Sequence, residues 1–158
     1  MSDVKIKYGT SNQTITITFT SLANNGARAS TVVDNSSNLF LDALVFLIIK
    51  AGAASTSASG YVNIYAYGTA DGGTNYTQSA SGSDAGITLT SPPNARLIGV
   101  ANVVVDAATY KVGPFAVAGA FGGSLPSGWG IIVENKTGGT LDASIGSAFY
   151  QGIQQQVV

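Results

Sequence analysis

The chain has 158 residues, of which 45% are apolar and only 9% are charged, and its formal net charge is −1. It contains no Cys and no His, which excludes disulfides, thiolate chemistry, imidazole bases and nearly all structural zinc sites. The scattered Lys and Arg residues form no basic stripe, and the longest apolar run (43–49) is far shorter than the roughly 20 residues that span a bilayer. We therefore expect neither a nucleic-acid partner nor a membrane partner.

The N-terminal third of the chain reads as a series of strands. Residues 1–9 alternate around Val4 and Ile6, which predicts an edge strand or an extended arm. Residues 13–20 (QTITITFT) alternate strictly and predict a half-buried strand with three apolar side chains on one face: Ile15, Ile17 and Phe19. A short strand is expected at 28–33, after the turn signal NNG.

Residues 39–50 (LFLDALVFLIIK) are rich in β-branched and aromatic residues and predict a strand. Apolar residues fall on both faces of this strand, which indicates a central position with cover on each side, a neighbouring subunit being one candidate for that cover. Asp42 interrupts the first half and is expected to mark a bulge. The small residues of 51–60 predict a surface loop.

Residues 61–67 (YVNIYAY) predict a strand that places Tyr61, Asn63, Tyr65 and Tyr67 on one face. Tyrosines on a strand are favoured at protein interfaces and at the rim of a core, and they can also form a platform for sugar rings. We expect the first use, at an interface or core rim.

The Asp71-Gly72-Gly73 step that follows has two interpretations. Asp-Gly between alternating segments is a strong hairpin signal. Alternatively, Asp71, Asn75 and Asp84 offer hard oxygen ligands for calcium. With only one carboxylate in the local loop, the hairpin is the stronger expectation, and no metal is expected.

The second half of the chain continues the same pattern. Strands are expected on both sides of Pro92-Pro93 within 87–105, in 110–121 where Gly113-Pro114 breaks the strand, and in 129–135 and 141–152. Turn signals recur about every 8–15 residues, which indicates an antiparallel sandwich or jelly roll. The predicted fold is all-β: one domain (1–158), an antiparallel β-sandwich of jelly-roll type with about eight strands.

The residues give no support for catalysis. Eight scattered acidic residues carry no local motif, and neither GxSxG nor SxxK is present. We expect no enzyme activity and no cofactor.

Four phrases resemble small virion structural proteins of tailed bacteriophages: TVVDNSSNLFLDALV (31–45), VNIYAYGTADGGTNYT (62–77), NARLIGV (94–100) and FGGSLPSGWGIIVEN (121–135). The resemblance covers roughly residues 4–150 in the same order, and none of the phrases is a chemical motif. It implies a capsid decoration (cement) protein with a jelly-roll core, placed on the outer capsid surface as a homotrimer that bridges subunits of the major capsid protein. The N-terminus MSDVKIKYG lacks an apolar signal segment, so synthesis in the cytoplasm of the host bacterium is expected.

The expected contact segments are the N-terminal arm (1–9) and the C-terminal tail (151–158), which carry apolar residues and lack an obvious partner within a closed sandwich. The alternative is that both ends fray. Trp129 is expected to be a rim or core anchor. The candidate interface residues are Val4, Ile6, Tyr8, Tyr61, Tyr65, Tyr67, Trp129, Val157 and Val158.

Two other roles stay open at this point. One is a phage tail or baseplate component, or a head fibre, with a jelly roll that binds host glycan. The other is a free carbohydrate-binding module, for which AYGTADGGTNYT would form the rim between two strands.

Overall fold

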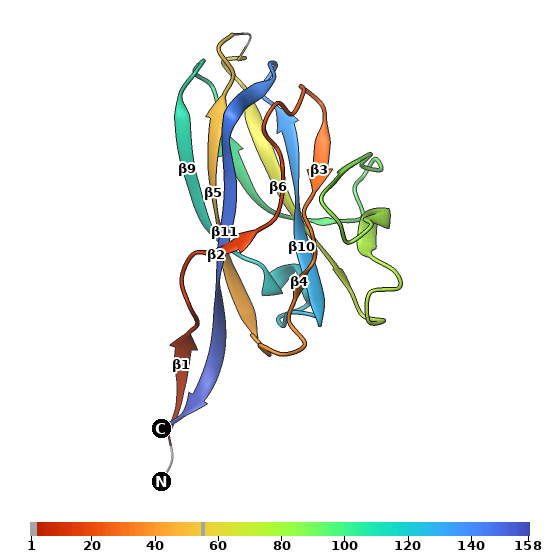
Figure 1. Ribbon diagram of the computed structural model, residues 1–158, viewed down its shortest axis with the longest axis vertical. Coiled ribbons are helices and arrows are strands. Elements are labelled where there is room, and N and C mark those ends of the chain that lie inside the picture. Colours follow the sequence, from red (N-terminus) through yellow and green to blue (C-terminus); the bar gives the residue numbers. More distant parts are fainter. Residues whose placement is uncertain (1–2, 55) are drawn as a thin grey trace.

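The computed structural model describes residues 3–54 and 56–158, so that residues 1 and 2 of the expected arm and residue 55 of the expected loop lie outside the described part. Within it, eleven strands form two antiparallel sheets that pack face to face (Figure 1). Two 3-10 turns, η1 (Thr77–Ser79) and η2 (Ala118–Phe121), are the helical elements of the same part. The predicted all-β antiparallel sandwich is confirmed.

The first sheet, sheet A, has the strand order β1-β11-β5-β9, and β2 also pairs with β11. Its strands are β1 (Val4–Tyr8), β2 (Gln13–Ile15), β5 (Asp42–Ala51), β9 (Thr109–Ala116) and β11 (Leu141–Val157). β11 is the longest strand and extends well beyond β5, because its last residues pair only with β1.

The second sheet, sheet B, has the strand order β7-β3-β10-β6-β8, and β4 also pairs with β10. Its strands are β3 (Ala27–Ala29), β4 (Val33–Asp34), β6 (Tyr61–Thr69), β7 (Ala85–Ile87), β8 (Arg96–Asn102) and β10 (Gly128–Lys136). β6 and β10 lie at its centre and pair over nine residues.

The main core lies between the two sheets and is built from alternate residues of their central strands. β5 contributes five side chains to it, all fully buried or nearly so: Ala43, Val45, Leu47, Ile49 and Ala51. The predicted inward face of 13–20 is confirmed, although only its first part is paired as a strand. Trp129 of β10 is fully buried, with its ring edge-on to Tyr150 at 5.3 Å between centroids.

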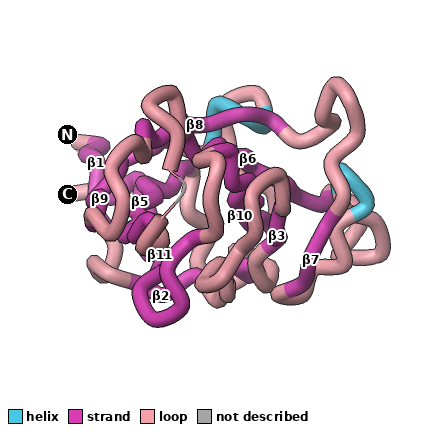
Figure 2. Tube along the Cα trace, turned by 90° about the horizontal axis from the view of Figure 1, so that it is seen from above, coloured by secondary structure: helices cyan, strands magenta, loops and turns pink. Residues whose placement is uncertain are grey.

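A second, smaller core lies on the other side of sheet B. The segment 70–95 leaves the sheet after β6, turns through η1 and returns as β7, so that it covers part of the outer face (Figure 2). Beneath it lie the side chains of Tyr65, Tyr67 and Ile132, packed with Ala80 and Ala95. The tyrosine face predicted for β6 therefore exists, but this chain covers it with its own segment.

Several local expectations need correction. The described part has eleven strands where about eight were expected, because β1, β4 and β7 are short additions to the larger framework. Asp42 begins β5 and is not in a bulge; the irregularity lies between Val45 and Leu47. The strand expected over 28–33 divides into β3 and β4.

The hairpin predicted at Asp71 is also wrong. β6 pairs with β8 and β10, whereas the next strand along the chain, β7, pairs with β3. Gly72 and Gly73 do adopt positive φ angles of 74° and 95°, as the sequence step requires. They form a wide loop at the start of 70–95 because β7 lies on the far edge of the sheet.

Candidate functional site

Three of the candidate interface residues are inside the molecule. Tyr67 and Trp129 have no exposed surface, and Tyr65 is only 8% exposed. A side chain with no accessible surface cannot contact a partner, so the interface expectation is wrong for Tyr67 and Trp129 and is not supported for Tyr65. Of the tyrosine face, Tyr61 is the one tyrosine that is exposed.

Tyr67 has a structural role. Its hydroxyl donates a hydrogen bond of 2.5 Å to the carbonyl oxygen of Ser30, and Tyr76 packs edge-on against its ring. Burial raises the pKa of the Tyr67 phenol to about 12. The segment at Ser30, which directly follows β3, is thus tied to β6.

A polar group of three residues surrounds Tyr65 on the same face. The Glu134 carboxylate accepts hydrogen bonds from Asn63 Nδ2 at 2.9 Å and from Tyr65 Oη at 3.0 Å. Lys136 Nζ lies 3.1 Å from the other carboxylate oxygen. Burial opposes ionisation of Glu134, but these hydrogen bonds and the lysine outweigh it and hold its pKa below the usual value. Burial and the nearby carboxylate raise the pKa of Tyr65 to about 12. The members satisfy one another, which is what a structural network requires.

The expected calcium ligands are engaged within the protein. The Asp71 carboxylate accepts hydrogen bonds from the backbone amides of Thr74 and Asn75 and from the Thr69 hydroxyl, and this holds its pKa well below the usual value. Asp84 bonds instead to Arg28, as described below. In the described residues, no group of three or more Asp, Glu, His or Cys side chains could hold a metal ion.

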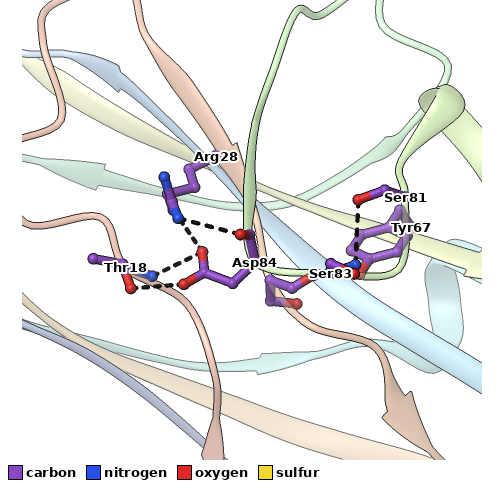
Figure 3. A network of polar contacts seen from close by, with 7 residues as sticks. Thr18, Arg28, Tyr67, Ser81, Ser83 and Asp84 are labelled. Atoms are coloured by element: carbon purple, nitrogen blue, oxygen red, sulfur yellow. Dashed lines mark hydrogen bonds and ion pairs between the residues drawn. The ribbon is translucent and has the colours of Figure 1, made fainter.

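Asp84 fixes the 70–95 segment to the sandwich (Figure 3). Its carboxylate accepts hydrogen bonds from Arg28 Nε at 2.5 Å and from the hydroxyl and the amide of Thr18 at 2.6 and 3.1 Å. Burial opposes ionisation, but these donors outweigh it and lower the pKa of Asp84. Ser83 and Ser81, drawn beside it, close a local turn. The contact joins three segments that are distant in sequence.

The two chain ends pair with each other, which corrects the expectation that they lack a partner. β1 runs antiparallel to the last residues of β11 over five residue pairs, from Val4 opposite Val157 to Tyr8 opposite Ile153. The two-stranded ribbon made by 3–8 and 153–158, called the terminal ribbon below, projects beyond the sandwich (Figure 1). Of the expected interface residues, Val4, Ile6, Tyr8, Val157 and Val158 are exposed on it.

The register sorts the side chains of the terminal ribbon onto two faces. Residues directly opposite each other in an antiparallel pair share a face. One face therefore carries Val4, Ile6, Tyr8, Ile153, Gln155 and Val157. The other carries Asp3, Lys5, Lys7, Gln154, Gln156 and Val158. The ribbon is amphipathic, and its apolar face is not covered by the described part of this chain.

The outer face of sheet A, away from the core, is apolar as well. Phe46 of β5 lies directly opposite Phe149 of β11, and both are half-buried. Leu44 and Ile48 flank Phe46 on the same face of β5. Leu44, Phe46, Phe149 and Pro114 help to line a hollow of about 300 Å³. We call this the body patch, consisting of Leu44, Phe46, Ile48, Pro114 and Phe149.

Half of this patch was predictable from the sequence. Apolar residues on both faces of 39–50 predicted outside cover for that strand, and the exposed side of β5 is the face concerned. Phe149 was missed, because the register that places it against Phe46 follows from the tertiary pairing. The structure thus brings together the body patch and the ends of the chain on one sheet.

Comparison with known proteins adds no assignment: no protein-family model matches this chain, and no curated protein matches it in sequence. In the described residues, no helix is long and apolar enough to cross a membrane.

Proposed function

We propose that this chain is a structural protein of a bacteriophage virion that decorates the capsid and stabilises it by bridging subunits of the major capsid protein. The observation that carries the proposal is the uncovered apolar surface of sheet A, made by the body patch and the terminal ribbon. Contiguous exposed apolar surface on a soluble domain marks sites of protein–protein contact. The residue resemblance described above supplies the particle context.

The strand order supports the jelly-roll type that the proposal includes. Leaving out β1, β4 and β7, the two sheets have the orders β2-β11-β5-β9 and β3-β10-β6-β8. Eight antiparallel strands in two such sheets are the framework of jelly rolls, a fold frequent in viral capsid proteins.

The low charge of the chain also supports a role in an assembly. Charged residues make up 9% of the sequence, against roughly 25% in an average soluble domain. Burying neutral polar side chains against a neighbour costs less than burying charges, because fewer strongly bound waters are lost. A shell component of the expected kind, present as a homo-oligomer such as a trimer, would use this property over several contacts. Many copies on one particle would then strengthen attachment through multivalency.

The glycan-binding alternative loses its expected platform. Tyr65 and Tyr67 would have to present their faces to a sugar ring, but both are covered by the 70–95 segment. Tyr61 alone does not make the row of aromatic faces that the interpretation required.

Co-sedimentation with capsids tests the proposal. Purified protein is mixed with undecorated capsids of the phage that encodes it, and the particles are pelleted. We expect saturable binding with a fixed number of copies per particle and a higher melting temperature of the decorated shell. Failure to pellet with the capsids at saturating concentration would contradict the proposal. A glycan array is the complementary measurement, and strong, specific binding there would favour the tail or fibre role.

A further inference from the structure

We infer that the apolar face of the terminal ribbon packs on the body patch of a second copy of this chain. This rests on the proposed structural role, in that it names the surface by which copies of this chain would form the homo-oligomer included in that role. The two apolar areas belong to one stripe, the described part of the chain leaves the ribbon's apolar face uncovered, and a second copy supplies the cover.

The strand β11 extends without interruption from the body patch into the terminal ribbon. Successive side chains of a strand alternate between faces, so its odd-numbered residues from 147 to 157 share one face. The paired register of β11 with β5 and then β1 is uninterrupted from Gly146 to Val157. Phe149, in the body patch, is therefore on the same face as Ile153 and Val157, in the ribbon. A mainly apolar stripe, interrupted by Gln151 and Gln155 of β11, extends from Ile48 through Phe149 and Ile153 to Val4.

The terminal ribbon makes few contacts with the rest of the described chain. A two-stranded antiparallel ribbon is marginally stable in water unless it packs on something. Beyond the Ile153–Asp42 pair, β11 has β1 on one side and no paired strand of the described chain on the other. The ribbon projects away from the sandwich (Figure 1), and Ile6 in the middle of its apolar face is 70% exposed. The described part of the chain therefore leaves the apolar face of the ribbon without cover.

The area of the stripe can be compared with the area that a stable protein–protein interface buries. From residue 147 to 157 the strand rises about 33 Å, at roughly 3.3 Å per residue, and three strands are about 10 Å wide. The stripe thus offers roughly 300–400 Å² in projection, whereas a stable interface buries about 800 Å² on each partner. It has the size of an apolar interface core, which neighbouring polar groups would complete as a rim. Thr14, opposite Phe149, lies beside the stripe, and Gln151 lies within it, between Phe149 and Ile153.

A second copy meets these conditions without further assumptions, because it carries the same stripe. Placing the ribbon of one copy on the body patch of another covers both halves, whether two copies pair about a two-fold axis or three close a ring. Two charged residues lie on the face of the stripe: Asp42, opposite Ile153, accepts hydrogen bonds from the backbone amides of Val117 and Ala118, and Lys111, opposite Ile48, is exposed on the edge strand β9. Lys5 and Lys7 point to the other face of the ribbon and stay in water. Lys50 is already paired with Asp142 at 3.0 Å.

Sedimentation of point variants tests the contact. We expect the wild-type chain to form a dimer or trimer at micromolar concentration. Ile6→Asp puts a charge in the centre of the apolar ribbon face, and we expect the dissociation constant for self-association to rise at least about tenfold. The matched control is Lys7→Asp, one residue further along on the polar face, for which association should stay near that of wild type. The circular dichroism spectrum should be unchanged in both, since both side chains are exposed in the single chain.

Site-specific cross-linking then identifies the two surfaces. The chain has no Cys, so each introduced thiol is unique. Ile6→Cys and Leu44→Cys proteins, one of them carrying a mass tag, are mixed, allowed to exchange subunits and treated with a short bismaleimide. A mixed product is expected for this pair. The control pair, Lys7→Cys with Leu44→Cys, should give several-fold less of it.

The outcomes separate this inference from the proposed function. A wild-type chain that is monomeric at all concentrations, or an Ile6→Asp variant that associates like wild type, would overturn the ribbon contact. If Ile6→Asp instead abolishes capsid binding by a monomeric chain, the stripe faces the capsid protein, so the inference fails and the proposed function stands. If the variants behave as expected but no form binds capsids, the inference stands and the proposed function fails.

Discussion

Val4 lies directly opposite Val157, so the second described residue from one end of the chain meets its counterpart at the other end. Asp3 and Val158, next along the ribbon, exchange both backbone hydrogen bonds, at 3.0 and 2.9 Å. Val4 and Val157 are therefore a non-hydrogen-bonded pair, in which Cα atoms approach to about 4.5 Å. The same alternation makes Ile6–Gln155 and Tyr8–Ile153 close pairs. The apolar face of the ribbon is thus the face on which the side chains are closest.

A disulfide tests this register. Val4→Cys together with Val157→Cys should close an intramolecular bond under mild oxidation, because the Cα separation falls within the range that disulfides accept. The product is a covalently closed chain with greater mobility on non-reducing gels and no free thiols. The control is Val4→Cys with Val158→Cys, whose second thiol lies on the opposite face and should remain largely reduced. Equal oxidation of the two variants would show that the register is wrong.

Loss of the Asp84 contact should loosen the 70–95 segment. Asp84→Asn removes the charge that accepts hydrogen bonds from Arg28 and Thr18. Because the site is partly exposed, we expect a loss of roughly 1–2 kcal/mol in the free energy of unfolding. Urea unfolding measures this, and hydrogen exchange should show faster exchange in 70–95 than in β5. The control is Asp106→Asn, which removes an exposed carboxylate that accepts a hydrogen bond from the backbone amide of Thr56 and does not contact the 70–95 segment.

The Asp84 carboxylate should make the free energy of unfolding depend on pH. The pKa of Asp84 is lowered in the folded state, because the donors from Arg28 and Thr18 outweigh its burial. The stabilisation is therefore present above the pKa of the unfolded chain, about 3.9, and is lost as the pH falls through the lower folded value. The difference in urea midpoint between wild type and Asp84→Asn should be constant from pH 7 to about 5 and should shrink below about pH 4. A difference that grows on acidification would contradict the assignment.

The buried hydroxyl of Tyr67 offers a matched pair of phenylalanine variants. Tyr67→Phe leaves the ring in place but removes the donor to the Ser30 carbonyl oxygen inside the smaller core. A buried acceptor left without its partner costs about 1–3 kcal/mol, and we expect a loss of that size in urea unfolding. Tyr61→Phe, at the exposed end of the same strand face, should change stability by less than about 0.5 kcal/mol. Similar losses for the two variants would argue against a buried Tyr67.

Two glycines of sheet B test how closely Tyr67 packs. A Cβ atom added at Gly130 would lie 2.5 Å from Tyr67 Cε1, so Gly130→Ala must displace the ring or the strand. Such overpacking typically costs about 1–3 kcal/mol. At Gly86 an added Cβ has no neighbour within 4 Å, and Gly86→Ala should be neutral or slightly stabilising. In thermal melts, the melting temperature should therefore fall for Gly130→Ala and should stay the same or rise slightly for Gly86→Ala.

The strand β6 shows how far the sequence determines the fold. The alternation in 61–67 correctly placed Tyr61, Tyr65 and Tyr67 on one face and Ile64 on the other, because the side-chain period of a strand is a local property of the backbone. The spacing of turns gave the sandwich class for a similar reason. The sequence did not reveal that 70–95 would fold over that face. Cover by a distant segment depends on packing and on a contact such as Arg28–Asp84.

For the candidate site too, some features follow from the sequence alone and others only from the tertiary structure. The sequence by itself determined that the chain ends carry alternating apolar residues and that 39–50 is apolar on both sides. Only the tertiary structure decided that the two ends pair, and that β11 places Phe149, Ile153 and Val157 on one continuous face. The physical reason is that alternation specifies which side chains share a face of one strand, while register between strands distant in sequence is set by the packing of the whole domain.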